Sequence, residues 1–221
     1  MKQLAEGLWS IPGFPPNAIN CWLMGDVLVD AATRRSGRRI LRALRGREVR
    51  AHALTHCHPD HQGATKQVCE TLDIPLWVGE RDVHPMETGE MESGNPDALA
   101  NKVIARLFQG PPHPVDRALR EGDAVAGFQV LEVPGHSPGH LAYWREADRT
   151  LLLGDVLNNM DVATGIPGLR EPKRAFTPDP ARNRESARRL AELEPALVCF
   201  GHGAPLRDTR KFVEFVRALP A

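Results

Sequence analysis

The sequence has no surplus of charge and few aromatic side chains. Its 28 lysines and arginines balance 28 aspartates and glutamates, and aromatic residues make up 5% of the 221 residues, with a single tyrosine. Proteins that bind nucleic acid through a general electrostatic surface carry a clear cationic excess. The charge balance therefore argues against nucleic acid as a partner of this protein.

The sequence also lacks any long hydrophobic run. No window approaches the roughly 20 apolar residues needed to cross a bilayer, and the first ten residues contain one lysine and no apolar stretch of signal-peptide length. The four cysteines form no CxxC pair and no small-domain disulfide framework. We therefore expect a cytoplasmic location, reduced thiols and no membrane partner.

Hydrophobic patterning predicts short strands mixed with helices. Asp179-Pro180 indicates a helix start, because an N-cap aspartate is followed by proline at the first helical position. This mixture predicts one layered α/β or α+β domain over residues 1–221, with helices covering sheets. Strands are expected at 26–30, 49–55, 75–78, 129–133, 141–144, 150–153 and 197–200. The strands at 141–144 and 150–153 are expected to form a hairpin. Helices are expected at 38–45, 62–72 and 179–193, and around Phe212, Val216 and Leu219.

Two long stretches interrupt this alternation. Residues 79–114 are rich in Gly, Pro and Glu, with one helix expected at 96–108, and residues 156–178 are predicted to be a long loop. Loops of this length in a compact domain are usually functional or disordered. We expect 79–114 to be an insertion that, together with 156–178, forms the walls of a binding pocket.

The densest group of metal-binding side chains follows the strand expected at 49–55. Residues 55–61 read THCHPDH, and the chain has nine histidines in total, so a chance polar turn is a poor explanation. A strand end fixes the direction of a side chain, and the turn after it lets neighbouring side chains converge. Imidazole and carboxylate suit zinc, iron or manganese. The candidate ligands here are His56, His58, Asp60 and His61.

The same arrangement, a strand end followed by a polar side chain, recurs three more times along the chain. PGHSPGH, Gly-Asp and Gly-His-Gly each follow a predicted strand. The glycines let the backbone turn sharply and approach an ion closely. Four such motifs at successive strand ends predict one shared metal site. The side chains that these three motifs add are His136, Asp155 and His202.

In this order, the four motifs resemble those of the metallo-β-lactamase-fold superfamily of hydrolases, and they are most similar to the hydroxyacylglutathione hydrolase (glyoxalase II)-like branch. The resemblance covers essentially the whole chain. It implies an α+β fold, a four-layer αβ/βα sandwich of two facing mixed sheets covered by helices. In the family pattern His140 is not a ligand, and we expect it to support the site. The implied ligands are His56, His58 and His136 for one metal, Asp60, His61 and His202 for the other, and Asp155 between them.

The resemblance also implies cofactors and an activity. Two divalent ions, zinc first with iron or manganese as alternatives, would share a water and lower its pKa towards about 7. The metal-bridged hydroxide would cleave a thioester, ester or lactone of a small-molecule substrate, and Asp60 would be catalytic by orienting this nucleophile. Because 19 residues follow His202, we do not expect the helical C-terminal domain that binds glutathione in hydroxyacylglutathione hydrolases. A homo-oligomer is compatible with these expectations.

The same motifs are compatible with other functions. An oxygenase similar to persulfide dioxygenases would hold one iron with His56 or His58, His136 and Asp155. A non-catalytic metal-binding protein would use the same ligands, and phosphodiester cleavage is a further alternative. Quorum-quenching lactonases carry a tyrosine shortly after the bridging aspartate, whereas Val-Leu-Asn-Asn follows Asp155 here, which disfavours a lactonase of that type.

Several further cysteine, aspartate and histidine side chains are not candidate ligands. Cys57 lies between two candidate ligands, but its side chain should point away from them, so we interpret it as a packed, inert thiol. Asp30 occupies the position of a supporting Asp-Thr-Gly turn in the family, although this sequence reads Asp-Ala-Ala, which leaves that role open. His52, His84 and His113 match no ligand position.

One segment departs from the balanced charge. Residues 34–50 contain eight arginines and one acidic residue. On the helix, Arg35, Arg38 or Arg39, Arg42 and Arg45 would share one face. The plain interpretation is a solvated surface. The alternative is a docking surface for an anionic substrate tail or an anionic partner.

Overall fold

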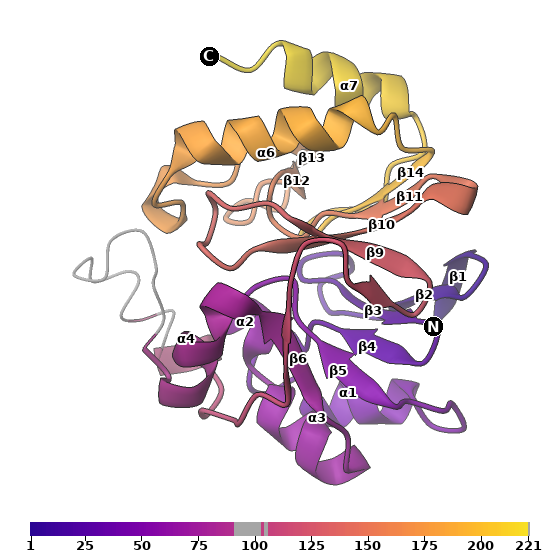
Figure 1. Ribbon diagram of the computed structural model, residues 1–221, viewed down its shortest axis with the longest axis vertical. Helices are drawn as coiled ribbons and strands as arrows, with labels where there is room; N and C mark the ends of the chain where they lie inside the picture. Colours follow the sequence, from indigo (N-terminus) through magenta and orange to yellow (C-terminus); the bar gives the residue numbers. More distant parts are fainter. Residues whose placement is uncertain (91–102, 104–105, 221) are drawn as a thin grey trace.

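Two mixed β-sheets face each other at the centre of the molecule, and helices cover the outer face of each sheet (Figure 1). The structure is a computed structural model and describes residues 1–90, 103 and 106–220. The layers follow the order helix, sheet, sheet, helix. This order confirms the predicted α+β four-layer sandwich.

The first sheet has seven strands that lie side by side in chain order. Each of its first four strands is antiparallel to the next. The last three strands run parallel to the fourth, because helical segments connect them. The strands are β1 (Lys2–Ala5), β2 (Leu8–Ile11), β3 (Cys21–Met24), β4 (Val27–Val29), β5 (Ala51–Ala53), β6 (Leu76–Gly79) and β7 (Arg117–Leu119). The connecting helices are α1 (Gly37–Ala43), α2 (Pro59–Gln62), α3 (Thr65–Leu72), the 3₁₀ helix η1 (Glu80–Asp82) and α4 (Val83–Thr88).

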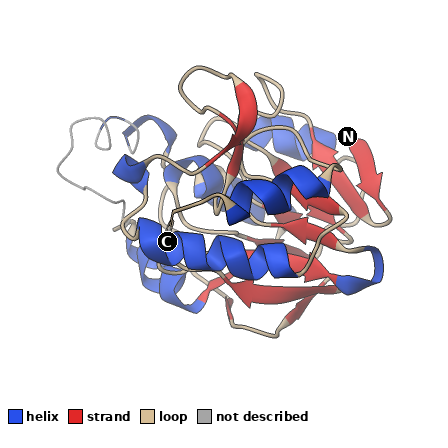
Figure 2. Ribbon diagram, turned by 90° about the horizontal axis from the view of Figure 1, so that it is seen from above, coloured by secondary structure: helices blue, strands red, loops and turns tan. Residues whose placement is uncertain are grey.

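The second sheet has five strands in the order β14-β11-β10-β9-β8, and only β11 and β14 are parallel. Two helices, α6 (Pro180–Glu192) and α7 (Thr209–Arg217), lie side by side over its outer face (Figure 2). The predicted hairpin is confirmed, because β10 and β11 pair across the 3₁₀ helix η2 (Glu146–Asp148). The strands are β8 (Ala124–Val125), β9 (Phe128–Glu132), β10 (Leu141–Arg145), β11 (Thr150–Leu152) and β14 (Leu197–Cys199).

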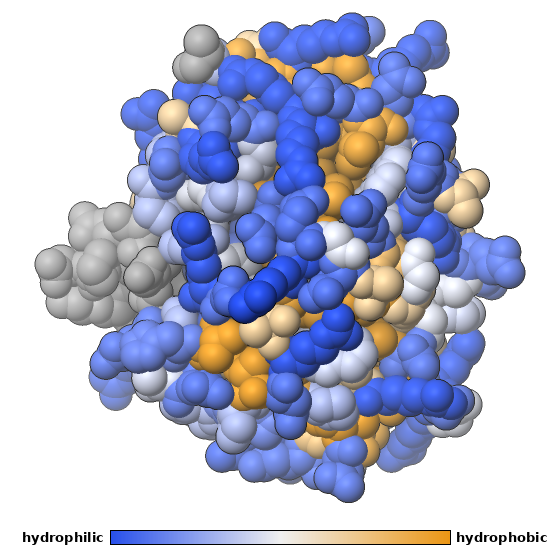
Figure 3. Space-filling model, viewed as in Figure 1, coloured by the Kyte–Doolittle hydropathy of each residue, from blue (hydrophilic) through white to orange (hydrophobic). Residues whose placement is uncertain are grey.

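Apolar side chains fill all three spaces between the layers. Trp22 from the first sheet packs with Phe128 and Tyr143 from the second sheet in the central cluster. The Tyr143 hydroxyl donates to the Leu54 carbonyl oxygen at 2.7 Å, so this buried polar group is satisfied. Each fully buried large side chain contributes about 1.5–3 kcal/mol. The outer surface is predominantly hydrophilic in the view of Figure 3.

Most predicted elements are present, with shifted ends. The helix predicted from Asp179 is confirmed, since the Asp179 side chain accepts the Arg182 amide at 2.9 Å. The prediction for α7 was too long, because the helix ends at Arg217 and Leu219 lies beyond it. None of the helices in the described part of the chain combines the length and hydropathy that a membrane span requires.

The prediction of an unbroken loop at 156–178 was wrong. This segment contains β12 (Asn158–Met160), β13 (Pro167–Arg170) and the 3₁₀ helix η3 (Arg174–Phe176), and the two strands pair with each other. Their sequences, Asn-Asn-Met and Pro-Gly-Leu-Arg, lack the apolar alternation that reveals a strand. The helix predicted at 96–108 falls largely outside the described residues, so the proposed pocket insertion at 79–114 stays a prediction.

Candidate metal centre

The seven candidate ligands gather where strands of both sheets end. His56 follows β5 in the first sheet, while His136, Asp155 and His202 follow β9, β11 and β14 in the second sheet. The short helix α2 carries Asp60 and His61, and His58 is the residue before its first turn. The two facing sheets thus bring together side chains that are up to 146 positions apart in the sequence.

The potential ligand atoms fall into groups within which they lie no more than 4.8 Å apart. One group consists of His56, His58 and His136, and another consists of Asp60, His61 and His202. A third group, made of His56, His61 and Asp155, links the other two. The geometry therefore separates two sets of three side chains with Asp155 between them.

Asp155 faces both sets with its two carboxylate oxygens. Its Oδ1 lies 3.5 Å from His61 Nε2, and its Oδ2 lies 3.1 Å from His202 Nε2 and 3.7 Å from His136 Nε2. On the side of the second set, His202 Nε2 lies 3.3 Å from Asp60 Oδ2. One carboxylate is thus within reach of both candidate ion positions.

The rings of His56 and His61 are oriented by one buried carboxylate, Asp30. Its Oδ2 accepts the Nδ1 proton of His61 at 2.9 Å and the Thr55 hydroxyl proton at 2.8 Å. Because the Thr55 hydroxyl has donated its only proton, it accepts from His56 Nδ1 at 3.0 Å. Both rings therefore carry a proton on Nδ1 and direct Nε2 towards the centre.

Two further rings are oriented in the same way. The Thr177 hydroxyl donates to the Lys173 carbonyl at 3.1 Å, so it accepts from His136 Nδ1 at 3.2 Å. His202 donates its Nδ1 proton to the Ala18 carbonyl oxygen, which is only an acceptor. An outer partner that fixes the histidine tautomer in this way is typical of metal-binding histidines.

Several inward-facing atoms are buried without a hydrogen bond. Among the described residues, no hydrogen-bond partner reaches Nε2 of His56, His61 or His136, or Oδ1 of Asp155. Burying polar atoms in this state costs free energy unless something else satisfies them. Divalent cations would satisfy all of them, since neutral imidazole and ionised carboxylate are ligands that zinc, iron and manganese accept. The donor set therefore fits a pair of metal ions.

The pKa shifts divide the centre into neutral and charged groups. Burial, reinforced by neighbouring histidines, lowers the pKa values of His56 and His136 well below the ordinary value. Burial opposes charge on His202 as well, but Asp155 and Asp60 outweigh it and raise the His202 pKa to about 10. The pKa of Asp155 is held well below its usual value, because His202 and His61 outweigh the effect of burial. The carboxylates of the centre thus draw positive charge to it.

His140 contacts the centre differently from the candidate ligands. Its Nε2 accepts the backbone amide proton of Asp155 at 3.2 Å, so this nitrogen faces the chain and not an ion. Burial lowers the His140 pKa to about 3, so the ring is neutral. The contact would let His140 support the site by positioning Asp155, and this role stays a prediction.

Gly201 provides space for the Asp155 carboxylate. A Cβ atom at position 201 would lie 1.9 Å from Asp155 Oδ1 and 2.7 Å from His61 Cε1. Gly201 also donates its amide proton to the Gly154 carbonyl, which ties the β14 loop to the β11 loop. The glycine in the Gly-His-Gly motif therefore lets the two loops approach each other.

Sequence reasoning left some positioning residues undetected. Thr177 and the Ala18 carbonyl each hold a ring of the cluster, yet neither belongs to a motif. The open question about Asp30 is answered by its contacts, because its carboxylate also accepts the Thr55 amide at 2.8 Å. Ala32, at the position of the glycine in the family's Asp-Thr-Gly turn, adopts a left-handed conformation with φ 52°. Glycine would adopt this conformation without strain.

The remaining histidines and Cys57 lie outside the cluster. Cys57 is buried, its thiol donates to the Asp82 carbonyl oxygen at 3.6 Å, and burial raises its pKa well above the ordinary value, as expected for an inert thiol. His52 is buried between β5 and α3, bonded to Leu28 and Thr65. His84 is 74% exposed.

The cluster is open to solvent on one side. The Asp60 side chain is 25% exposed, whereas the other six candidate ligands are 7% exposed or less. A small hollow lined by His58, Arg81 and Ser137 adjoins the first set. Solvent therefore reaches the cluster on the side of Asp60.

Comparison with known proteins identifies similar chains. A sequence model of the metallo-β-lactamase superfamily matches residues 14–202, which include all seven candidate ligands. The Bacillus subtilis (strain 168) protein named Probable metallo-hydrolase YflN is 32% identical over 198 residues, which cover 81% of this chain and 71% of that protein. The hydroxyacylglutathione hydrolase of Bdellovibrio bacteriovorus is 24% identical over 176 residues, covering 78% of this chain and 55% of that enzyme.

A solved structure extends the similarity to three dimensions. The crystal structure of TTHA1623 in a di-iron-bound form superposes with a TM-score of 0.64 and 28% sequence identity. The superposition covers 97% of this chain and 96% of that one. The similarity therefore includes both sheets and the loops at their common edge.

Proposed function

This chain belongs to the metallo-β-lactamase superfamily, and from that membership we propose that it is a dinuclear metallohydrolase that cleaves a thioester, ester or lactone. The observation that carries the proposal is the pair of three-residue sets with Asp155 between them. A single structural ion would leave one of these buried sets without a partner.

Each proposed ligand follows from the direction of its ring or carboxylate. His56, His58 and His136 would hold the first ion, Asp60, His61 and His202 would hold the second, and Asp155 would contact both. Nitrogen and oxygen ligands without sulfur favour zinc, with iron or manganese as alternatives. The related TTHA1623 has been crystallised in a di-iron-bound form, which supports a pair of ions in this fold.

Two bound divalent ions would lower the pKa of a shared water and polarise the substrate carbonyl. The residues of the chain would bind and orient the reactants around this chemistry. Burial opposes ionisation of Asp60, but hydrogen bonding to His202 and the charge of His61 outweigh it and lower the Asp60 pKa. Asp60 is therefore ionised and partly exposed, and we assign it the catalytic role of orienting the attacking water.

The substrate class is proposed from relatives and from the type of site. The hydroxyacylglutathione hydrolase of B. bacteriovorus acts, as its name states, on an acylated glutathione, which favours a thioester over the other two classes. We also propose a small-molecule substrate, a single domain over residues 1–221 and a cytoplasmic location. All four cysteines are free and buried, which suits a reducing compartment.

The test compares turnover of thioesters, lactones, esters and phosphodiesters by the metal-loaded protein, the chelated protein and two histidine variants. We expect thioester, ester or lactone turnover that is lost on chelation and in His58→Ala. The matched control, His84→Ala, changes an exposed histidine outside the cluster and should retain activity. Turnover restricted to phosphodiesters, or oxygen consumption with a persulfide and one iron per chain, would contradict the proposal.

A further inference from the structure

Arginines without acidic partners are concentrated on one outer face of the molecule. All six are exposed, and none forms an ion pair with a carboxylate of the described residues, whereas the nearby Arg50 pairs with both Asp26 and Glu48. The six are Arg34, Arg35, Arg38, Arg42, Arg45 and Arg47, at and around α1.

This concentration is large relative to the charge of the whole chain. Residues 34–50 carry eight arginines and one glutamate, a net charge of +7, while the complete sequence is neutral, so the other residues together carry −7. Charge segregated in this way produces a local positive potential that the overall balance hides. The face around α1 would attract an anionic partner even though the protein as a whole would not.

The arginines at the start of α1 do not stabilise this helix. Arg38 and Arg39 occupy the first turn of α1, where the helix dipole disfavours positive charge, and that turn contains no acidic residue. The N-cap Ser36 makes no side-chain cap hydrogen bond. Arg38 and Arg42 are four positions apart, which places like charges side by side. Arg42, in the last turn, lies where the helix dipole favours positive charge, but folding of α1 gives no such reason for Arg38 and Arg39.

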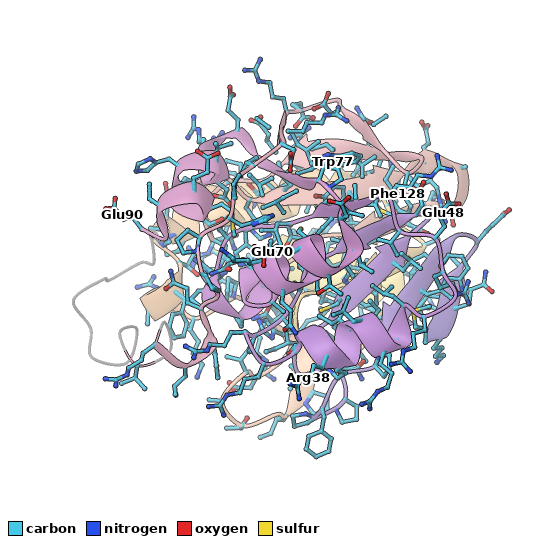
Figure 4. All side chains as sticks on the ribbon, turned by 90° about the horizontal axis from the view of Figure 1, so that it is seen from below. Arg38, Glu48, Glu70, Trp77, Glu90 and Phe128 are labelled. Atoms are coloured by element: carbon cyan, nitrogen blue, oxygen red, sulfur yellow. The ribbon has the colours of Figure 1, made fainter. Side chains whose placement is uncertain are left out.

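A groove runs between α1 and α3, which lie side by side on this face (Figure 4). One part, of about 590 Å³, is lined by Arg38, Arg42, Arg45 and Arg47. The other part, of about 830 Å³, borders α3 and not α1, and Thr71 lines both parts. Its lining includes Arg34, Lys66, Glu70, Arg106 and residues 109–111. Glu70, labelled on α3 in Figure 4, lines the larger part and pairs with Lys66 at 3.6 Å.

The lining of the groove indicates the type of occupant. Leu41, Leu44, Val49 and Leu72 lie among the arginines in the smaller part, so apolar surface alternates with positive charge. None of the described residues that line either part is aromatic, and the nearby Trp9 ring is covered by the Arg47 guanidinium at 4.8 Å. Proteins that bind single-stranded nucleic acid provide exposed aromatic rings for base stacking, whereas arginine is enriched at protein interfaces.

From these observations we propose that the α1–α3 groove docks an acidic polypeptide segment of a partner protein. Carboxylates of the segment would pair with Arg38, Arg42 and Arg45, and its apolar side chains would cover Leu41 and Leu72. Arginine and carboxylate form paired hydrogen bonds of good geometry, and the incoming negative charge would also relieve the repulsion within α1. This role is separate from the proposed hydrolysis.

The experiment measures binding of a fluorescently labelled peptide rich in glutamate, with interspersed leucines, to the metal-loaded full chain by anisotropy. The groove variant combines Arg38→Glu, Arg42→Glu and Arg45→Glu. The control variant combines Arg174→Glu, Arg210→Glu and Arg217→Glu, which changes the net charge equally at exposed arginines outside the α1–α3 face. We expect affinity to fall at least ten-fold in the groove variant and to stay within two-fold in the control.

A second variant, Arg38→Gln, Arg42→Gln and Arg45→Gln, guards against a folding defect, because it removes charge from α1 without reversing it. It should also weaken binding while its unfolding temperature stays at or above that of the parent. Equal losses in groove and control variants would mean general attraction to charge and would overturn the proposal. Absence of peptide binding, or tighter binding of an RNA oligonucleotide of the same length, would overturn it as well.

Discussion

Asp155 and His140 differ in how they contact the candidate centre, although both are buried and close together. Asp155 lies within 3.7 Å of histidines from both sets. The His140 ring instead accepts the Asp155 backbone amide proton and lies against the His56 ring, with centroids 4.5 Å apart. Replacing Asp155 should therefore weaken both ion sites. Replacing His140 should leave the ligands in place and disturb only the position of one of them.

We predict that Asp155→Ala loses at least one metal ion per chain and reduces kcat/KM by several orders of magnitude. His140→Ala should retain two ions and lose about 10- to 100-fold in activity, as is usual when the outer partner of a metal ligand is removed. Elemental analysis and steady-state kinetics of both variants check this. Equal losses of metal in the two variants would show that His140 is itself a ligand.

The residues that could be predicted from the sequence are those whose side chains carry the chemistry. His56, His136, Asp155 and His202 stand out because each follows a predicted strand. The Ala18 carbonyl that holds His202 could not be predicted, since every residue has such a group and only the fold selects one. Thr177 was missed because its partner His136 is 41 positions away and the surrounding segment has no regular pattern.

At the scale of elements, His52 links β4, β5 and α3 beneath the centre. Its two ring nitrogens contact the Leu28 carbonyl oxygen and the Thr65 hydroxyl, each at 3.0 Å. Burial lowers the His52 pKa to about 4 from an ordinary 6.5. The unfolded chain therefore binds this proton more tightly than the folded chain, and the stability that His52 provides is lost as pH falls from about 6.5 to 4.

We predict that His52 contributes about 3 kcal/mol to the loss of unfolding free energy across this pH range. The measurement compares denaturant unfolding of the parent protein and His52→Gln at several pH values. The variant should be less stable at pH 7, because it loses a buried contact, and its stability should depend less on pH. Parallel pH curves for the two proteins would show that His52 does not titrate in this way.

The hydrophobic pattern of the sequence predicted the elements that have continuous apolar runs between turn residues, such as β4, β11 and β14. It missed β12 and β13, whose pairing depends on backbone hydrogen bonds between polar, proline and glycine residues. It assigned no strand to residues 2–24, where β1 to β3 form a meander. Such strands are stabilised by their neighbours in the sheet, which a local pattern does not contain.

At the scale of the whole molecule, two kinds of charge organisation coexist in a neutral chain. Buried carboxylates at the common edge of the sheets draw positive charge into the candidate centre. Exposed arginines around α1 concentrate positive charge on the outside of the first sheet. The four-layer fold could be predicted because the motifs and their order resemble those of a known family. The position of the arginine groove could not, because it depends on how α1 packs against α3.

The central claim is that two ions lie between the two sets of side chains with Asp155 in contact with both. A crystal structure of the metal-loaded protein, with anomalous scattering recorded at the edge of the bound metal, tests this directly. We predict two anomalous peaks, one bordered by His56, His58 and His136 and one bordered by Asp60, His61 and His202. A single peak, or peaks away from these side chains, would contradict the account.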